Sequence, residues 1–308
     1  MNFLKLIRYK NLIMLALMQL LFRYGFLNLQ KISLALQDWQ FILLVLSTVL
    51  IAAAGYVINN IMDQETDRIN KPQNLIVGKS ISEQTAYYIY VVLNCTGVGI
   101  GFYLANVIGK PNFAALFILI AATLYMYATS LKQMAVIGNF VVALLLAISV
   151  IVVGIFDLYP IVTQENKSVM GSLFSIFLDY AFYAFMINFL REIVKDLEDI
   201  EGDYKQGMKT LPIIFGLKRT KNLVLALSIL PIVFIIIYIK TYLFPFRLYF
   251  AIFYSMIFIL APLFLFVAKL ATAKTQKEFH YLSTLLKQIL FLGILSIVIL
   301  NLNIKYNA

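Results

Sequence analysis

The chain has 308 residues, of which 62% are hydrophobic, and its mean hydropathy is +0.89. These values exclude an ordinary soluble domain and place the chain among polytopic membrane proteins. A net charge of +10 would suggest nucleic-acid binding in a soluble protein. Here the basic residues occupy short loops between apolar runs, so we expect no nucleic-acid partner and attribute the charge to membrane orientation.

The chain contains one histidine, His280, and one cysteine, Cys95. A single cysteine excludes a disulfide within the chain, and a single histidine excludes a His-rich metal site. A metal bound by this protein must therefore be held by oxygen ligands. Such ligands favour Mg²⁺, Mn²⁺ or Ca²⁺.

Nine apolar runs are each close to the roughly 20 residues that a helix needs to cross a bilayer. They cover residues 11–28, 41–58, 85–108, 113–131, 137–157, 171–190, 222–239, 247–268 and 285–303. Arg23 interrupts the first run, and Lys132 and Gln133 alone mark the turn between the fourth and the fifth. We predict an all-α polytopic membrane protein with nine transmembrane helices, forming one domain over residues 1–308.

The orientation follows from the basic residues. A cytoplasmic N-terminus places 18 of the 25 Lys and Arg residues on the cytoplasmic side of the nine runs. Under the positive-inside rule, this bias predicts a C-terminus on the outer side. We therefore expect an integral protein of the cell (inner) membrane, with its N-terminus and active-site loops in the cytoplasm.

The second apolar run ends in a short polar stretch. Asn59, Asp63 and Asp67 are spaced four residues apart there, so a helix would place them in one stripe. Two carboxylates one turn apart, about 6 Å in rise, can share or bridge divalent cations. Arg68 and Lys71 follow directly, as a phosphate-binding surface requires.

The sixth apolar run ends in a similar stretch. Asp196, Asp199 and Asp203 follow Arg191 and Lys195, and their spacing places the three carboxylates on one helical face. Four crossings separate the two stretches, so both emerge on the same side of the membrane, and the two halves of the chain resemble a diverged repeat. A solvated helix end would explain one carboxylate pair. Two stripes of matched spacing favour a cation site, because carboxylates close to lipid are costly.

The two stripes together suggest a substrate. Their five carboxylates could hold two or three Mg²⁺ ions, which normally keep waters and share substrate phosphates. The neighbouring cations would supply the remaining positive charge: Arg68, Lys71, Lys132, Arg191 and Lys195. Such a pocket, opening to lipid, suits a diphosphate on an isoprenoid tail. The cations would make the diphosphate a better leaving group, and exclusion of water would protect the allylic carbocation.

The motifs Asn59-x-x-x-Asp63-x-x-x-Asp67 and Asp196-x-x-Asp199-x-x-x-Asp203 resemble the two signatures of the UbiA superfamily of intramembrane prenyltransferases. Other local matches are Arg8-Tyr9-Lys10-Asn11 and Tyr127-Ala128-Thr129-Ser130-Leu131-Lys132, followed by Gly138-Asn139. The resemblance extends from residue 8 to about residue 220, and the last three spans match only in being apolar. The chain departs from the family pattern at Asn60, where Asp is frequent, and at Val77-Gly78-Lys79.

The resemblance implies nine helices around a central cavity, with Mg²⁺ as the cofactor and a polyprenyl diphosphate as a substrate. It implies catalytic or metal-binding roles for the residues of the two motifs: Asn59, Asp63, Asp67, Asp196, Asp199 and Asp203. With the basic residues above, it gives this set of substrate-binding residues: Arg8, Asn11, Asn59, Arg68, Lys71, Tyr127, Lys132, Asn139, Arg191 and Lys195.

The surroundings of both motifs look most like the geranylgeranylglycerol-phosphate geranylgeranyltransferase branch, which implies a phosphorylated lipid as the acceptor. Cations remaining on the same face would bind its phosphate: Arg8, Lys10, Arg68, Lys71 and Lys79. An aromatic acid of the 4-hydroxybenzoate or homogentisate type is the alternative acceptor. A membrane transporter is a remoter alternative, because its acidic residues should lie near mid-membrane on broken helices.

Overall fold

The computed structural model describes residues 2–70 and 75–307. In this part of the chain, nine helical segments are long and apolar enough to cross a membrane. They are Tyr9–Gln30, Asp38–Met62, Glu83–Val107, Pro111–Thr129, Ile137–Ile161, Lys167–Glu198, Leu217–Leu243, Tyr249–Thr272 and Gln276–Tyr306. All nine predicted spans are thus confirmed, and Arg23 does not end the first of them.

The helices are numbered in chain order. The first half contains α1 (Asn2–Leu6), α2 (Tyr9–Tyr24), α3 (Asp38–Met62), α4 (Gln64–Asn70), α5 (Glu83–Val107), α6 (Ala114–Thr129) and α7 (Ile137–Asp157). The second half contains α8 (Lys167–Glu198), α9 (Ile200–Lys205), α10 (Leu211–Phe215), α11 (Leu217–Leu227), α12 (Ile229–Tyr238), α13 (Tyr249–Ser255), α14 (Ala261–Thr272) and α15 (Gln276–Asn307). Short 3₁₀ or π segments join several of them, including η4 (Leu131–Gln133), η6 (Ile239–Leu243) and η7 (Met256–Leu260).

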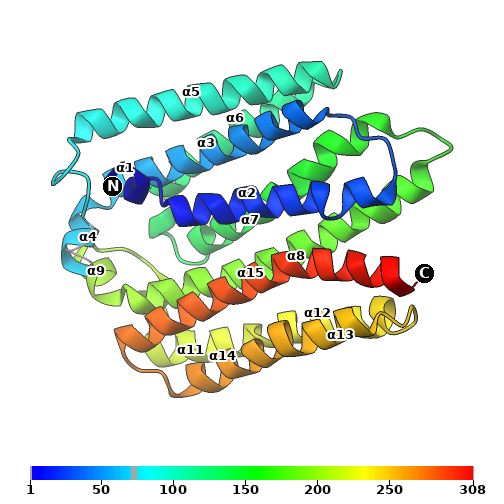
Figure 1. Cartoon of the computed structure of the whole chain (residues 1–308). Helices are drawn as coiled ribbons and strands as arrows, with labels where there is room; N and C mark the ends of the chain where they lie inside the picture. The colour runs from blue at the N-terminus through cyan, green and yellow to red at the C-terminus, as the bar shows by residue number, and fades with distance from the viewer. Residues whose placement is uncertain (1, 71–74, 308) are drawn as a thin grey trace.

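The long helices run roughly parallel to one another, and the two chain ends lie at opposite ends of the bundle (Figure 1). Helix α8 lies between the two halves, because it packs against α7 on one side and against α15 on the other. It also contributes side chains to both of the large hydrophobic clusters. The ends of α3 and α8, where the two motifs lie, are therefore tied to one packed scaffold.

Two glycines show how closely neighbouring spans approach. A Cβ at Gly154 on α7 would lie 2.9 Å from the ring of Phe174 on α8. A Cβ at Gly97 on α5 would lie 2.8 Å from the side chain of Ile51 on α3, and the Ser47 hydroxyl donates to the Gly97 carbonyl at 2.7 Å. Small residues at such contacts let helices in lipid gain van der Waals contact and interhelical hydrogen bonds.

Arg23 lies inside the bundle because its charge is neutralised there. Its side chain is 3% exposed, and Nη1 donates to Asp157 Oδ1 at 2.6 Å. Nη2 donates to the Leu36 carbonyl at 2.7 Å and to Asp38 Oδ1 at 3.1 Å. The guanidinium also lies 4.6 Å from the centre of the Phe41 ring. This pair joins the ends of α2, α3 and α7 that are remote from the motifs.

We expect Arg23→Met to destabilise the protein by about 3 kcal/mol, because it leaves the fully buried Asp157 carboxylate without its cation. Thermal unfolding in detergent will measure the loss. The double variant Arg23→Met/Asp157→Leu should recover most of it, since both charges are then removed. Equal stability of the single variant and the wild type would show that the pair does not hold these helix ends together.

Candidate active site

The first motif lies where α3 ends and α4 begins. Asp63 is the residue between the two helices, with φ −90° and ψ 5°. Its N–H donates to the Asn59 carbonyl at 2.9 Å, and the Asp67 N–H donates to the Asp63 carbonyl at 2.8 Å. These bonds preserve the four-residue spacing through the interruption. The three motif residues thus follow one another by one turn, as the sequence predicts, although Asp63 itself stands between two helices.

The second motif has the same local structure. Asp199 separates α8 from α9, with φ −100° and ψ 11°. Its N–H donates to the Lys195 carbonyl at 2.9 Å, and the Asp203 N–H donates to the Asp199 carbonyl at 3.1 Å. Both motifs therefore place an aspartate at a helix interruption and another four residues later. This correspondence supports the diverged repeat that the spacing suggests.

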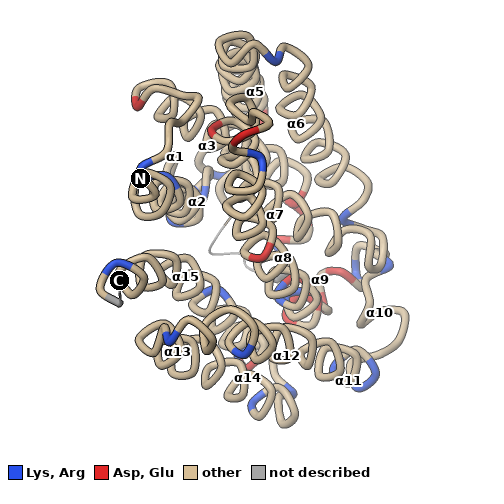
Figure 2. Tube along the Cα trace, turned by 90° about the vertical axis from the view of Figure 1, so that its right-hand side faces the viewer, with Lys and Arg blue, Asp and Glu red and all other residues tan. Residues whose placement is uncertain are grey.

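The two interruptions face each other at one end of the bundle. Helix α4 packs against α9, and both lie at the same end in Figure 1. The loop after α6 reaches both motifs, because Lys132 contacts Asp63 and the Lys209 N–H, just after α9, donates to the Gln133 carbonyl at 3.0 Å. Acidic and basic residues lie next to one another around α8 and α9 in the end-on view of Figure 2. Residues more than 130 positions apart thus share one site.

Hydrogen bonds, one ion pair and electrostatic proximity define what we call the acidic group: Asn59, Asp63, Lys132, Asn139, Asp196, Asp199 and Asp203. Asp63 Oδ2 accepts from Asn59 Nδ2 at 2.8 Å and contacts the Lys132 ammonium. Asn139 Nδ2 donates to Asp196 Oδ2 at 2.9 Å. Asp203 lies within electrostatic reach of Asp63, Lys132 and Asp199. The predicted residues Lys132 and Asn139 therefore do meet the aspartates.

Asp203 shows how strongly negative charge is concentrated here. Burial and, to a smaller extent, the nearby Asp199 carboxylate raise the pKa of Asp203, which reaches about 6. Lys132 opposes this shift. Burial and a neighbouring like charge both disfavour the ionised form of a carboxyl. An added cation would stabilise that ionised form.

The donor set of the acidic group fits Mg²⁺. Its potential ligands are carboxylate and amide oxygens, and Asn59 Oδ1 is buried without a hydrogen-bond partner. Among the described residues, no three acidic, histidine or cysteine side chains are clustered closely enough to form a ready-made metal site. Mg²⁺ usually keeps waters and takes oxygens from substrate phosphates, so an all-protein cage is not required.

A second set of charges lies beside the acidic group. We call it the basic group: Arg8, Arg191, Lys195 and Lys287, with Glu192. Glu192 is buried, and its two oxygens accept from Arg191 Nη1 at 3.1 Å and from Lys195 Nζ at 2.8 Å. Arg8 lies within electrostatic reach of Glu192, Lys195 and Lys287.

The remaining contacts of the basic group come from α2 and α3. The Lys287 ammonium donates to Asn11 Oδ1, and Asn11 Nδ2 donates to the Tyr56 hydroxyl at 3.2 Å. The Arg8 guanidinium lies 5.3 Å from the centre of the Tyr56 ring. Arg8 adopts φ 50° and ψ 52°, a left-handed conformation that costs a non-glycine residue energy and is often found at functional sites.

Tyr127 links the two groups. It is half-buried near the end of α6, within electrostatic reach of Asp63 and Asp196 in the acidic group. It is also within reach of Arg8 and Glu192 in the basic group. The two groups therefore line neighbouring parts of one polar region. The resemblance-based prediction that Arg8, Asn11 and Tyr127 lie with the motif residues agrees with this arrangement.

The other predicted residues differ in exposure, and Lys10 lies within electrostatic reach of Lys287. Asp67 is half-buried and Arg68 is exposed on α4, while Lys10 and Lys79 are also exposed. Lys71 lies outside the described residues. That Arg8, Lys10, Arg68, Lys71 and Lys79 together bind an acceptor phosphate stays a prediction. Arg8 lies within electrostatic reach of Lys195 and Lys287.

Sequence reasoning missed Lys287, Glu192 and Tyr56 as site residues. The available signal was strongest for Lys287, which stands inside the last apolar run, where a charged residue is costly. Its partner Asn11 is 276 positions away. Glu192 lies between predicted residues, but its role as a shared partner of two cations depends on side-chain directions.

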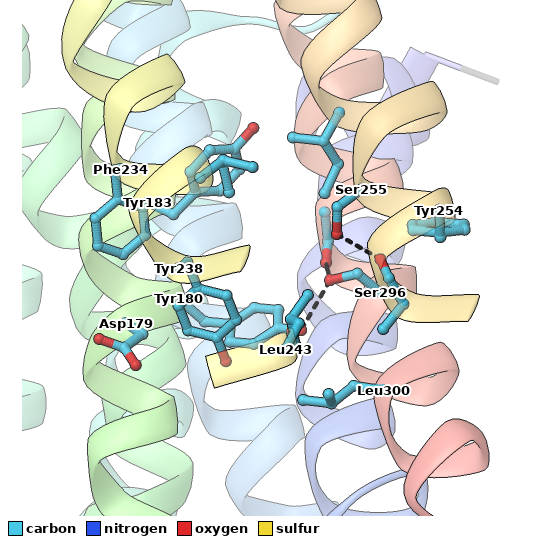
Figure 3. Close-up of a pocket in the computed structure, with 14 residues that line it drawn as sticks. Asp179, Tyr180, Tyr183, Phe234, Tyr238, Leu243, Tyr254, Ser255, Ser296 and Leu300 are labelled. Atoms are coloured by element: carbon cyan, nitrogen blue, oxygen red, sulfur yellow. Dashed lines mark hydrogen bonds between the residues drawn. The ribbon is translucent and has the colours of Figure 1, made fainter. Parts of the chain in front are cut away.

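A separate pocket lies farther along α8, between this helix and α12, α13 and α15 (Figure 3). Asp179, Tyr180 and Tyr183 line it from α8, and the Tyr180 and Ser296 hydroxyls are 2.8 Å apart. It encloses about 50 Å³. Asp179 precedes Asp196 by 17 positions, about 25 Å of helical rise. This pocket is therefore distinct from the acidic group.

Comparison with known families places these features in context. The UbiA prenyltransferase family matches residues 19–297. A digeranylgeranylglyceryl phosphate synthase of Korarchaeum cryptofilum is 30% identical over 87% of this chain and 88% of its own length. A digeranylgeranylglyceryl phosphate synthase of Methanosphaera stadtmanae is 31% identical over 81% of this chain and 84% of its own length. One of Thermococcus kodakarensis is 35% identical, but the alignment covers 62% of each chain, under two thirds of that relative's length.

Solved structures share the fold. A digeranylgeranylglyceryl phosphate synthase structure is 25% identical with a TM-score of 0.66, and the match covers 97% of both chains. A UbiA homologue from Archaeoglobus fulgidus bound to GPP and Mg²⁺ has a TM-score of 0.62 at 16% identity, covering 96% of this chain and 99% of its own. The second likeness bears on the fold alone.

The contact between Lys132 and Asp63 yields a prediction for metal binding. A divalent cation that binds Asp63 must displace the Lys132 ammonium, so Lys132→Gln should tighten binding of Mn²⁺ in the absence of substrate. We expect about a fivefold tighter Kd, matching the loss of roughly 1 kcal/mol of competing ion pairing. Electron paramagnetic resonance of free Mn²⁺ will measure it. Lys209→Gln on the neighbouring loop is the control, and weaker Mn²⁺ binding by Lys132→Gln would contradict the competition.

Proposed function

Because the chain belongs to the UbiA prenyltransferase family, we propose that it transfers a geranylgeranyl group from geranylgeranyl diphosphate to geranylgeranylglyceryl phosphate. The acceptor hydroxyl oxygen bonds to C1 of the donor as the bond from C1 to the diphosphate oxygen breaks. The hydroxyl proton is released, and the products are digeranylgeranylglyceryl phosphate and diphosphate. The names of the relatives support this choice of substrates.

One observation carries the proposal. Two interrupted helix ends bring the carboxylates of both motifs and Lys132 to a single place, next to a second group rich in cations. A prenyl diphosphate needs both kinds of group, because its charge must be neutralised before it can leave. A neutral or cationic cargo would not need this concentration of cations.

We propose that Mg²⁺ acts with the donor, held by Asn59, Asp63, Asp67, Asp196, Asp199 and Asp203, where it would neutralise the diphosphate and make it a better leaving group. Lys132, once it leaves Asp63, donates to diphosphate oxygens. Asn139 keeps Asp196 oriented through its 2.9 Å bond. Glu192 holds Arg191 and Lys195 in place, so their charge is fixed before substrate enters.

We further propose that the protein is one domain that lies in the cell membrane with its N-terminus and both motifs on the cytoplasmic side. The membership of α8 in both large hydrophobic clusters supports a single unit. The opposite placement of the termini suits an odd number of spans (Figure 1). The excess of basic residues at the motif side supports the orientation.

The acceptor distinguishes this proposal from the aromatic alternative. Purified protein given geranylgeranyl diphosphate, Mg²⁺ and equal concentrations of geranylgeranylglyceryl phosphate, 4-hydroxybenzoate and homogentisate should prenylate the phosphorylated lipid at least about tenfold faster than either aromatic acid, because the basic group has charge for a second phosphate. Radiolabelled products separated by chromatography will give the ratio. Efficient prenylation of an aromatic acid alone would reverse the assignment of the acceptor.

The same assay has internal controls. Asp199→Asn should lower turnover at least about a hundredfold, because an amide cannot balance the charge of a divalent cation. Glu201→Gln, an exposed neighbour on α9, should leave turnover unchanged. Loss of activity in both variants would point to disruption of α9 rather than to loss of a ligand.

A further inference from the structure

The basic group contains more positive charge than its own carboxylate neutralises. Four cations come from three parts of the chain: Arg8 between α1 and α2, Arg191 and Lys195 on α8, and Lys287 on α15. The one carboxylate in the group, Glu192, already accepts from Arg191 and Lys195 through its separate oxygens. Lys287 contacts a neutral amide, that of Asn11.

The position of the basic group makes this imbalance costly. Arg191 precedes Asp199 by eight positions, about 12 Å of helical rise, and Tyr56 precedes Asp63 by seven, about 10 Å. The basic group therefore lies deeper in the bundle than the helix interruptions. Charges inside a membrane protein are expensive unless paired, and those retained commonly mark a substrate path.

Individual atoms of the group have bonding capacity left. Arg191 Nε is buried and has no hydrogen-bond partner. Lys287 is half-buried, and its ammonium has three donors. The Lys195 side chain keeps 27% of its surface accessible. These donors would suit an acceptor-only, multiply charged ligand, and a phosphate monoester is such a ligand.

We infer that the basic group binds the phosphate of the acceptor lipid, and that Lys287 selects a phosphorylated acceptor over its neutral alcohol. This inference rests on the proposed function and assigns a role to the last span. The donor diphosphate lies instead at the acidic group, because a diphosphate shared with divalent cations needs carboxylates nearby. The basic group has one carboxylate, and two cations occupy it.

Tyr127 places the two phosphate sites within one region, since it lies within electrostatic reach of Asp63 and Asp196 on one side and of Arg8 and Glu192 on the other. The reacting hydroxyl of a glyceryl lipid is separated from its phosphate by a few bonds. A phosphate held by Arg8, Arg191 and Lys287 therefore leaves that hydroxyl free to reach toward the donor carbon. The basic group thus orients the acceptor as well as binding it.

Direct binding tests the assignment without catalysis. The probes are geranylgeranylglyceryl phosphate and geranylgeranylglycerol, titrated by calorimetry into the full chain in lipid nanodiscs without donor. Wild type should bind the phosphate far more tightly than the alcohol. Lys287→Gln should weaken binding of the phosphate about tenfold and leave the alcohol unchanged. Lys287→Arg should retain most of the affinity, and Lys277→Gln, an exposed change on the same helix, should bind as wild type does.

The outcomes separate the inference from the proposed function. Unchanged phosphate binding by Lys287→Gln, with normal unfolding temperature, would overturn the inference even if wild type turns over both substrates. Weaker binding of a non-hydrolysable geranylgeranyl diphosphate analogue, rather than of the acceptor, would also overturn it and assign Lys287 to the donor. Selective binding of the phosphate through Lys287 by a protein that transfers no prenyl group would support the site while refuting the proposed function.

Discussion

Charge inside a membrane must be neutralised where it stands, because lipid offers no solvation. This constraint divides the charged residues of the bundle into two kinds. Arg23 and Asp157 neutralise each other at 2.6 Å, fully enclosed, and tie together helix ends remote from the motifs. The acidic and basic groups at the other end are different, because each holds an excess of one sign of charge, and Lys195 of one group acts on Asp196 of the other. The first pair is structural, and the two groups are suited to a charged substrate.

The acidic group depends on two helix interruptions of the same form. An aspartate at each interruption donates its N–H to a carbonyl four residues earlier, and another aspartate follows four residues later. Each span ends at its interruption, and the backbone bonds across it keep the motif residues one helical turn apart. Helix α8 then relates the acidic group to the basic group, since Lys195 and Asp196 are adjacent on it and point to different partners. The single helix α8 thereby fixes the separation between the acidic group and the basic group.

The sequence was sufficient for the spans and for most of the acidic group, because length, hydropathy and motif spacing are local properties. The buried pair of Arg23 with Asp157 was not predictable, since its partners are 134 positions apart and neither belongs to a motif. The interruptions at Asp63 and Asp199 were also hidden, because a four-residue spacing is the same in a continuous helix. Lys287 was missed because the last spans matched the family in apolarity alone.

The central claim is that both motifs form one site for a divalent cation and a diphosphate together. Its most direct test is the coupling between Mg²⁺ and a non-hydrolysable geranylgeranyl thiodiphosphate, measured as the change that each causes in the Kd of the other. The account predicts that Mg²⁺ tightens analogue binding at least about tenfold in the wild type and has little effect in Asp63→Asn or in Asp199→Asn. Coupling of wild-type size in either variant would show that one motif suffices and would contradict the account.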